Sequence, residues 1–295
     1  MSLNDPMKTA FVFPGQGSQI VGMGKELAEN STHALSVFNE VNDALDQNLS
    51  SLMFEGPIED LTLTFNAQPA LMASSMAIVR VLEKEFGLRV GDVATYMAGH
   101  SLGEYSALVA SGSIDFKTAL NLVYKRGLFM EKSDAGSMFA ILNLDIETIY
   151  SICDEVRDTL DEIVAPANIN SANQVVIAGS HESAALAAEK CKVAGAKRTI
   201  QLKVSVASHC NLMQSASILL SEEMKNIKFN NPTIPIIHNV DALEGNNDDD
   251  IAQKLTDQLI KPVQLPVLRH SLFWKLNVTS SATFRYREFM DLGSK

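Results

Sequence analysis

A serine between two glycines has the spacing of a catalytic nucleophile. Gly99, Ser101 and Gly103 fit the pattern G-x-S-x-G. An apolar run typical of a strand precedes them at 93–98, and an Ala- and Leu-rich stretch that predicts a helix follows at 102–110. The turn between such elements is sharp, so it needs small neighbours, and the helix start directs its free N–H groups at the serine. Chance produces G-x-S-x-G often, and a buried structural serine is the alternative; the strand and the helix favour the nucleophile.

A nucleophilic serine requires a nearby base, and the sequence offers six histidines. His209 lies in SVASHCNLM, where a predicted insertion returns to the main body of the fold. A residue at such a junction is expected to face a cleft between two parts of the protein, where sites commonly form. His209 is therefore the first candidate for the base and His238 the second, while His100 is expected to point away from the serine.

The elements around these residues alternate between strand and helix patterns. Residues 9–13 (TAFVF) form an apolar run that Pro14-Gly15 ends, as in a strand buried on both faces. Helical spacing of apolar residues follows at Val37, Val41, Leu45 and Leu49, which predicts a helix over 37–49. The same spacing recurs over 71–82 and over 119–130. This alternation predicts an α/β fold with a mostly parallel sheet.

Residues 137–204 are predicted to form an inserted subdomain. Their patterns give strands and helices in the order β-α-β-β-α-β, which is the order of a ferredoxin-like unit. The expected strands are 138–142, 164–168, 174–178 and 198–204, and the expected helices are 146–156 and 182–193. The predicted architecture is a large α/β-hydrolase-like domain, residues 1–136 and 205–295, with a ferredoxin-like subdomain, residues 137–204, inserted into it.

Composition excludes several classes of function. The chain has 295 residues and a net charge of −11, which disfavours a nucleic-acid partner because binding to phosphates needs a basic face. Three cysteines without CxxC spacing predict neither a disulfide framework nor a zinc site, and they favour a reducing compartment. No apolar run approaches the roughly 20 residues of a membrane span, and the stretch before Pro14 is too short for a signal peptide. A cytoplasmic protein without a membrane or metal partner is expected.

Several longer motifs occur in one order along the chain. They are FVFPGQGSQ, TLTFNAQPAL, AGHSLGEYSAL, KRGLFM, NSANQVVIAG, AGAKR, SVASHC and KPVQ. Together they closely resemble the malonyl-CoA:acyl carrier protein transacylase family of fatty-acid synthesis, from about residue 9 to residue 264. The resemblance implies a ping-pong transfer of malonyl from malonyl-CoA to the phosphopantetheine thiol of acyl carrier protein, through a malonyl-serine and without a cofactor.

The resemblance also implies roles for matching residues. Ser101 would be the acylated nucleophile, His209 its base and Arg126 the clamp for the malonyl carboxylate. A planar guanidinium suits that task, although the residues alone leave Arg126 open between a site and a solvated helix edge.

The remaining implied roles belong to backbone groups. The N–H groups of Gln16 and Leu102 would form the oxyanion hole, and the backbone carbonyl of Gln264, in KPVQ, would orient His209. Carrier proteins of this pathway are acidic, so a basic cluster near the end of the insertion is the candidate docking surface, with scattered surface charges as the alternative. The cluster consists of Lys192, Lys197, Arg198 and Lys203.

The motifs end at Gln264. Residues 265–295 contain the only tryptophan, Trp274, and lack the Gly-Pro-Gly segment that the family normally carries. A monomer is expected, but a divergent tail predicts lower stability, association through the tail or a misplaced Gln264 carbonyl. Two alternatives therefore stay open: a serine esterase or thioesterase that shares Ser101 and His209, and a catalytically impaired protein that only binds a partner.

Overall fold

The structure is a computed structural model that describes residues 9–204 and 206–264. The predictions for the tail after Gln264, including Trp274, lie outside these residues. The described strands are β1 (Thr9–Phe13), β2 (Ala94–Gly99), β3 (Ser137–Leu142), β4 (Val164–Ser171), β5 (Gln174–Gly179), β6 (Arg198–Gln201), β7 (Ile236–Ile237), β8 (Glu244–Gly245) and β9 (Val263–Gln264). The helices are α1 (Lys25–Asn30), α2 (Thr32–Leu45), α3 (Leu49–Glu55), α4 (Ile58–Thr62), α5 (Thr64–Lys84), α6 (Val90–Val93), α7 (Leu102–Ala110), α8 (Phe116–Glu131), α9 (Ile146–Leu160), α10 (His181–Val193), the 3₁₀ turn η1 (Asn211–Met213), α11 (Gln214–Met224) and α12 (Ile251–Asp257).

The main sheet has the strand order β1-β2-β7-β8 and is mostly parallel, as predicted. β2 pairs in parallel with both β1 and β7, and β8 adds an antiparallel edge. Phe13, the last residue of β1, pairs with Gly99, the last residue of β2. Because parallel strands end at the same edge of a sheet, the loop with Gln16 and the turn with Ser101 meet there.

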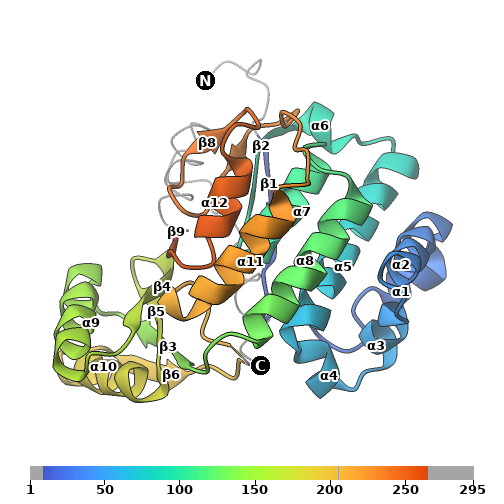
Figure 1. Cartoon of the computed structure of the whole chain (residues 1–295). Coiled ribbons are helices and arrows are strands. Elements are labelled where there is room, and N and C mark those ends of the chain that lie inside the picture. The colour runs from blue at the N-terminus through green and yellow to red at the C-terminus, as the bar shows by residue number, and fades with distance from the viewer. Residues whose placement is uncertain (1–8, 205, 265–295) are drawn as a thin grey trace, which may run out of the picture.

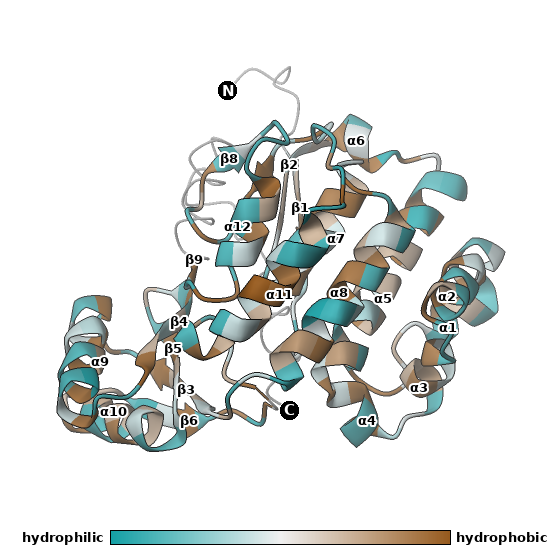
Figure 2. Ribbon diagram, in the orientation of Figure 1, coloured by the Kyte–Doolittle hydropathy of each residue, from teal (hydrophilic) through white to brown (hydrophobic). Residues whose placement is uncertain are grey.

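Helices α5, α7 and α8 form the core that holds this sheet (Figure 1). α5 is buried over 14 of its 21 residues, because α2, α7 and α8 all pack against it. α8 is amphipathic, and brown and teal bands alternate along it in Figure 2. Its buried stripe contains Ala119, Val123, Arg126 and Met130 at helical spacing, so Arg126 is an arginine on an apolar face.

The second sheet, β6-β3-β5-β4-β9, lies beside the main one. β3, β4, β5 and β6 pair antiparallel, and α9 and α10 cover the sheet with a separate apolar cluster that includes Ile141, Cys153 and Ile177. Figure 1 shows these helices grouped at one end of the molecule. The short β9 pairs in parallel with β4, with Asn168 opposite Val263, so the C-terminal part of the described chain closes this sheet.

Several predicted elements differ in extent from the observed ones, among them α5, α9 and β4, and two further differences change the order of the elements or the end of a strand. The helix expected over Val37–Leu49 is two helices, because Asp46 takes a left-handed conformation (φ 48°) that ends α2 and Asn48 caps α3. The strand expected at 198–204 ends at Gln201, since the chain beyond it turns to line a cavity. No helix within 9–204 and 206–264 is long and apolar enough to cross a bilayer. All three cysteines are free and buried.

Candidate active site

Ser101 occupies a strained turn between β2 and α7. Its backbone has φ 50° and ψ −106°, a region that non-glycine residues rarely adopt. A Cβ atom added to Gly99 would lie 1.9 Å from the carbonyl carbon of Gly103, and one added to Gly103 would lie 2.2 Å from the carbonyl oxygen of Phe13. The turn therefore requires both glycines, which accounts for the G-x-S-x-G pattern.

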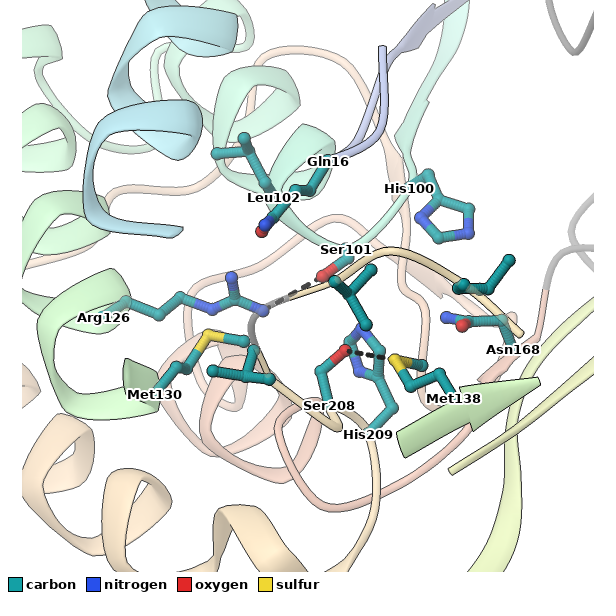
Figure 3. Close-up of a pocket in the computed structure, with 13 residues that line it drawn as sticks. Gln16, His100, Ser101, Leu102, Arg126, Met130, Met138, Asn168, Ser208 and His209 are labelled. Carbon is teal, nitrogen blue, oxygen red and sulfur yellow. Dashed lines mark hydrogen bonds between the residues drawn. The ribbon is translucent and has the colours of Figure 1, made fainter. Parts of the chain in front are cut away.

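The serine opens onto a small cavity of about 100 Å³, which is lined by segments that follow β1 and β2 of the main sheet and by strand residues of the second sheet (Figure 3). In the figure, the side chains of Arg126, Ser101 and His209 converge on this space from three different segments. The lining residues are Gln16, His100, Ser101, Leu102, Arg126, Met130, Met138, Asn168, Leu202, Val204, Val206, Ser208 and His209. The structure thus brings together five of the predicted site residues that are far apart in sequence.

Arg126 is a buried cation with neutral hydrogen-bond partners. Its side chain is 1% exposed; Nη2 donates to Ser101 Oγ and to Gln258 Oε1, each at 3.0 Å, and Nη1 donates to Gln68 Oε1 at 2.8 Å. Its Nε–H has no acceptor among the described residues. Burial lowers the pKa of Arg126, although the nearby Glu104 carboxylate opposes this. An arginine stays protonated in any case, so the cavity contains a positive charge that no carboxylate of the described part of the chain neutralises by direct contact.

His209 is a buried base in a defined tautomer. Its Nδ1 lies 2.6 Å from the backbone carbonyl of Gln258, so Nδ1–H donates and Nε2 carries the lone pair in the neutral ring. Burial, and next the positive charge of Arg126, lower the pKa of His209 to about 3. No hydrogen bond between His209 and Ser101 occurs among the described contacts; the serine oxygen accepts from Arg126 Nη2.

The prediction that Gln264 orients His209 is wrong, because Gln258 does so. Gln258 follows the last residue of α12, and a carbonyl at a helix end lacks an intrahelical partner and can accept from the imidazole. Gln264 lies in β9, where its N–H donates to the Asn239 carbonyl at 3.0 Å and its amide donates to the Val240 carbonyl at 2.5 Å. The available signal in the sequence was a glutamine at a helix end, Gln258. The resemblance assigned the role instead to the nearby glutamine of KPVQ, Gln264.

Two residues that line the cavity, Gln16 and Leu102, have backbone N–H groups without a described acceptor. Leu102 is the first residue of α7, so its N–H is one of the donors that a helix leaves free. Gln16 follows β1, and a Cβ added to Gly15 would lie 2.5 Å from the His100 carbonyl oxygen, so glycine there lets the two loops approach. Both Gln16 and Leu102 line the cavity and are candidate donors to an oxyanion.

Sequence reasoning missed the polar residues beneath the serine. The Ser101 N–H donates to Asn239 Oδ1 at 2.7 Å, and Asn239 Nδ2 donates to the Gly99 carbonyl at 2.7 Å. His238, the second candidate for the base, does not line the cavity and instead bonds Glu104 Oε1 at 2.7 Å. A polar pair, His-Asn, directly after the strand β7 was the available signal. His100 lines the cavity, with Nε2 3.2 Å from Asn170 Oδ1.

The four predicted docking residues are all exposed: Lys192 is in the last turn of α10, and Arg198 begins β6. Lys197 directly precedes β6, and Lys203 follows its end by two residues. Lys203 stands between Leu202 and Val204, which line the cavity, so it lies at the cavity rim. The described residues contain no group of three or more His, Cys, Asp and Glu side chains able to hold a metal ion.

Known proteins are similar to this chain in sequence and in fold over most of its length. Residues 10–273 match the acyl transferase domain family. The malonyl CoA-acyl carrier protein transacylase of Escherichia coli (strain K12) is 45% identical over 258 residues, which cover 86% of this chain and 82% of that protein. The chain belongs to the malonyl CoA-acyl carrier protein transacylase family. The transacylase of Bacillus subtilis (strain 168) is 44% identical and covers 87% of this chain and 80% of its own length.

Solved transacylase structures superpose on the described fold. An acyl carrier protein S-malonyltransferase from Vibrio cholerae has a TM-score of 0.85 at 43% identity and covers 90% of this chain and 86% of that one. A malonyl-transacylase in complex with a type II polyketide synthase acyl-carrier protein has a TM-score of 0.86 at 42% identity, with 92% and 86% covered. The transacylase family therefore accounts for the mixed α/β architecture.

Proposed function

We propose that this protein transfers a malonyl group from malonyl-CoA to the phosphopantetheine thiol of acyl carrier protein. One observation carries the proposal: the Arg126 guanidinium lies 3.0 Å from the oxygen of Ser101, and no anionic side chain within residues 9–204 and 206–264 hydrogen-bonds to it. The free carboxylate of a malonyl group is one methylene away from the thioester carbon that a serine attacks. A cation beside the nucleophile therefore fits a short diacid and binds it through paired N–H donors.

In the first half-reaction, Ser101 Oγ attacks the thioester carbon while Nε2 of His209 takes the hydroxyl proton. The carbonyl oxygen becomes an oxyanion on the N–H groups of Leu102 and Gln16. When the tetrahedral intermediate collapses, the C–S bond breaks, and the leaving sulfur of CoA takes the proton from His209. The product is a malonyl-serine ester and free CoA.

In the second half-reaction, the carrier thiol replaces CoA and the steps run in reverse. His209 takes the thiol proton, sulfur attacks the ester carbon, and the proton returns to Ser101 Oγ as the C–O bond breaks. Neither half changes an oxidation state, and the mechanism uses only side chains and backbone groups of this chain, in keeping with the predicted absence of a cofactor.

We further propose that the fold is an α/β-hydrolase-like domain with a ferredoxin-like subdomain at about 137–204. The spatial order β6-β3-β5-β4 for successive β, α, β, β, α and β elements supports the second part. A cavity enclosed by both parts helps exclude water, so the ester survives until a thiol arrives. The cytoplasmic location remains a prediction.

For the carrier we propose a docking surface formed by Lys192, Lys197, Arg198 and Lys203. Its position supports this, because Lys203 is at the rim of the cavity and no ion pair to the four residues occurs in the described part.

Reversing two charges, Lys197→Glu with Lys203→Glu, is expected to raise the KM for carrier protein roughly tenfold by removing electrostatic attraction, and to leave malonyl-CoA acylation nearly unchanged. Steady-state kinetics with each substrate varied will test this; an unchanged carrier KM would reject the surface.

The lowered pKa of His209 gives a pH prediction. A base must be neutral, and a pKa of about 3 in place of 6.5 keeps His209 neutral through the mildly acidic range. The rate of Ser101 acylation is therefore expected to stay level from about pH 8 to about pH 5, without the inflection near 6.5 of an ordinary histidine. The unfolded chain binds this proton below about pH 6.5, whereas the folded chain stays unprotonated until about pH 3. The free energy of unfolding should therefore decrease as the pH falls from about 6.5 toward 3. Stopped-flow acylation with a melting curve at each pH will separate the two effects.

The proposed function is tested by intact-protein mass spectrometry after brief mixing with malonyl-CoA. A malonyl adduct on Ser101 that persists in water and disappears on adding carrier protein is expected. An adduct lost equally fast without carrier would favour the esterase or thioesterase alternative. A folded protein that forms no adduct would favour the impaired alternative.

A further inference from the structure

A buried polar cluster lies behind the cavity, and none of its side chains takes part in the bond-making steps proposed above. It consists of Glu104 in the first turn of α7, His238 and Asn239 after β7, and Gln258 at the end of α12, each 1% exposed or less. None of the four lines the cavity. A carboxylate buried this deeply is costly unless its oxygens are fully hydrogen-bonded.

The Glu104 carboxylate accepts from three donors. His238 Nδ1 lies 2.7 Å from Oε1, while the backbone N–H of Asn239 and Nε2 of Gln258 donate to Oε2 at 3.1 Å and 2.7 Å. An ionised carboxylate has only acceptor sites, and here both of its oxygens are in use. The cluster is therefore fully paired around Glu104.

This pairing fixes which way the Gln258 amide faces. Its nitrogen has Glu104, the Ser101 carbonyl at 3.1 Å and Asn239 Oδ1 at 3.4 Å as acceptors. Its oxygen therefore faces Nη2 of Arg126, at 3.0 Å. A flipped amide would oppose oxygen to the carboxylate and NH₂ to the guanidinium, and both contacts are repulsive.

We propose that Glu104 is a positioning residue for the carboxylate clamp: through the side chain of Gln258 it aligns Arg126 and thereby favours acyl groups that carry a carboxylate. The inference rests on the proposed function and names the residue that gives the clamp its geometry. Gln68 and Ser101 also contact Arg126, but Gln258 is the partner that a buried charge holds. The planar guanidinium must bind the substrate carboxylate through two parallel N–H donors. A small rotation of the Arg126 side chain should therefore lower the rate of malonyl transfer to Ser101.

Two substitutions at position 104 separate alignment from bulk. Glu104→Met fills similar space and removes the acceptors, whereas Glu104→Gln keeps one oxygen for Asn239 N–H and the Gln258 amide and turns its NH₂ toward His238, whose ring then accepts in its other tautomer. Single-turnover acylation of Ser101 is measured with malonyl-CoA and with acetyl-CoA, which lacks the carboxylate. We expect E104M to lower the malonyl rate at subsaturating substrate roughly 10- to 100-fold and the acetyl rate less than about threefold, and E104Q to recover most of the malonyl rate.

Gln258→Met supplies a second, independent break in the same connection. It keeps the backbone carbonyl that orients His209 and removes the amide between Glu104 and Arg126. E104M, Q258M and the double variant should show the same fall in the malonyl-to-acetyl ratio, because the second change breaks nothing further. If E104M does not fold, Q258M alone must show that fall.

The contrary results are distinct. Equal losses for malonyl and acetyl that follow the melting temperature would make Glu104 merely structural and would reject the inference while wild-type malonylation stands. A Q258M protein with an unchanged ratio would reject it as well. A wild-type protein without a malonyl adduct would remove the proposed function, and the clamp with it.

Discussion

Replacing Ser101 by alanine is expected to eliminate the malonyl adduct and to lower transfer to the carrier on the order of 10⁶-fold. Ser101 lies in the strained turn and lines the cavity, and it is the oxygen that His209 activates for the first half-reaction of the proposed mechanism. Intact-protein mass spectrometry and a steady-state transfer assay will measure the loss. The variant should remain folded, because the turn depends on Gly99 and Gly103 and not on the hydroxyl.

Ser208 provides the matched control, because it also lines the cavity and carries a hydroxyl. Its oxygen contacts the sulfur of Met138 at 3.8 Å and has no contact with Arg126. Ser208→Ala should still form the adduct. An adduct that survives in S101A and disappears in S208A would assign the nucleophile to Ser208 and contradict the site described here.

Replacing Arg126 by alanine is expected to lower malonyl acylation by roughly 100-fold or more, since the paired charged hydrogen bonds of a carboxylate contribute about 3 kcal/mol. Acetyl acylation should change far less, because acetyl brings no carboxylate to the clamp. Arg126→Lys retains the charge without the planar fork and should fall between the two. Single-turnover acylation with both thioesters gives the comparison.

The folded state of R126A needs a separate check, since the change empties space and leaves the Gln68 and Gln258 oxygens without their donor. A melting curve will show any loss of stability. Equal losses for malonyl and acetyl in a folded R126A would show that the arginine supports the site without selecting the acyl group.

The sequence predicted the elements whose patterns are local. TAFVF forms β1 as expected, and G-x-S-x-G marks the turn in part because Gly99 is limited by Gly103, four residues further along the chain. The limit at Gly103 comes instead from Phe13 at the end of β1, which only the fold brings close. Arg126 could be placed on an apolar stripe by helical spacing, yet only the structure shows that it faces the cavity and not solvent. The family resemblance supplied the roles, and the fold brought their residues together.

The sequence did not predict contacts that depend on where chain ends and helix ends fall in space. Gln258 and Gln264 are six residues apart, and the helix end at Asp257 decides which carbonyl reaches His209. The left-handed residue Asp46 ends α2 before α3 begins, although the apolar spacing in the sequence continues across this break. Glu104 lies in an ordinary first turn of a helix, and its partners come from residues more than 130 positions away.

The burial of all three cysteines has a consequence for a protein that handles thioesters and free thiols. Burial raises the pKa of Cys153 to about 12 and of Cys191 and Cys210 to about 11, so almost no thiolate is present at neutral pH. We therefore expect the three cysteines neither to intercept the acyl group nor to exchange with an oxidised CoA disulfide. In the proposed mechanism the acyl group is then carried inside the protein by the oxygen of Ser101 alone, and otherwise by the sulfur atoms of its two substrates.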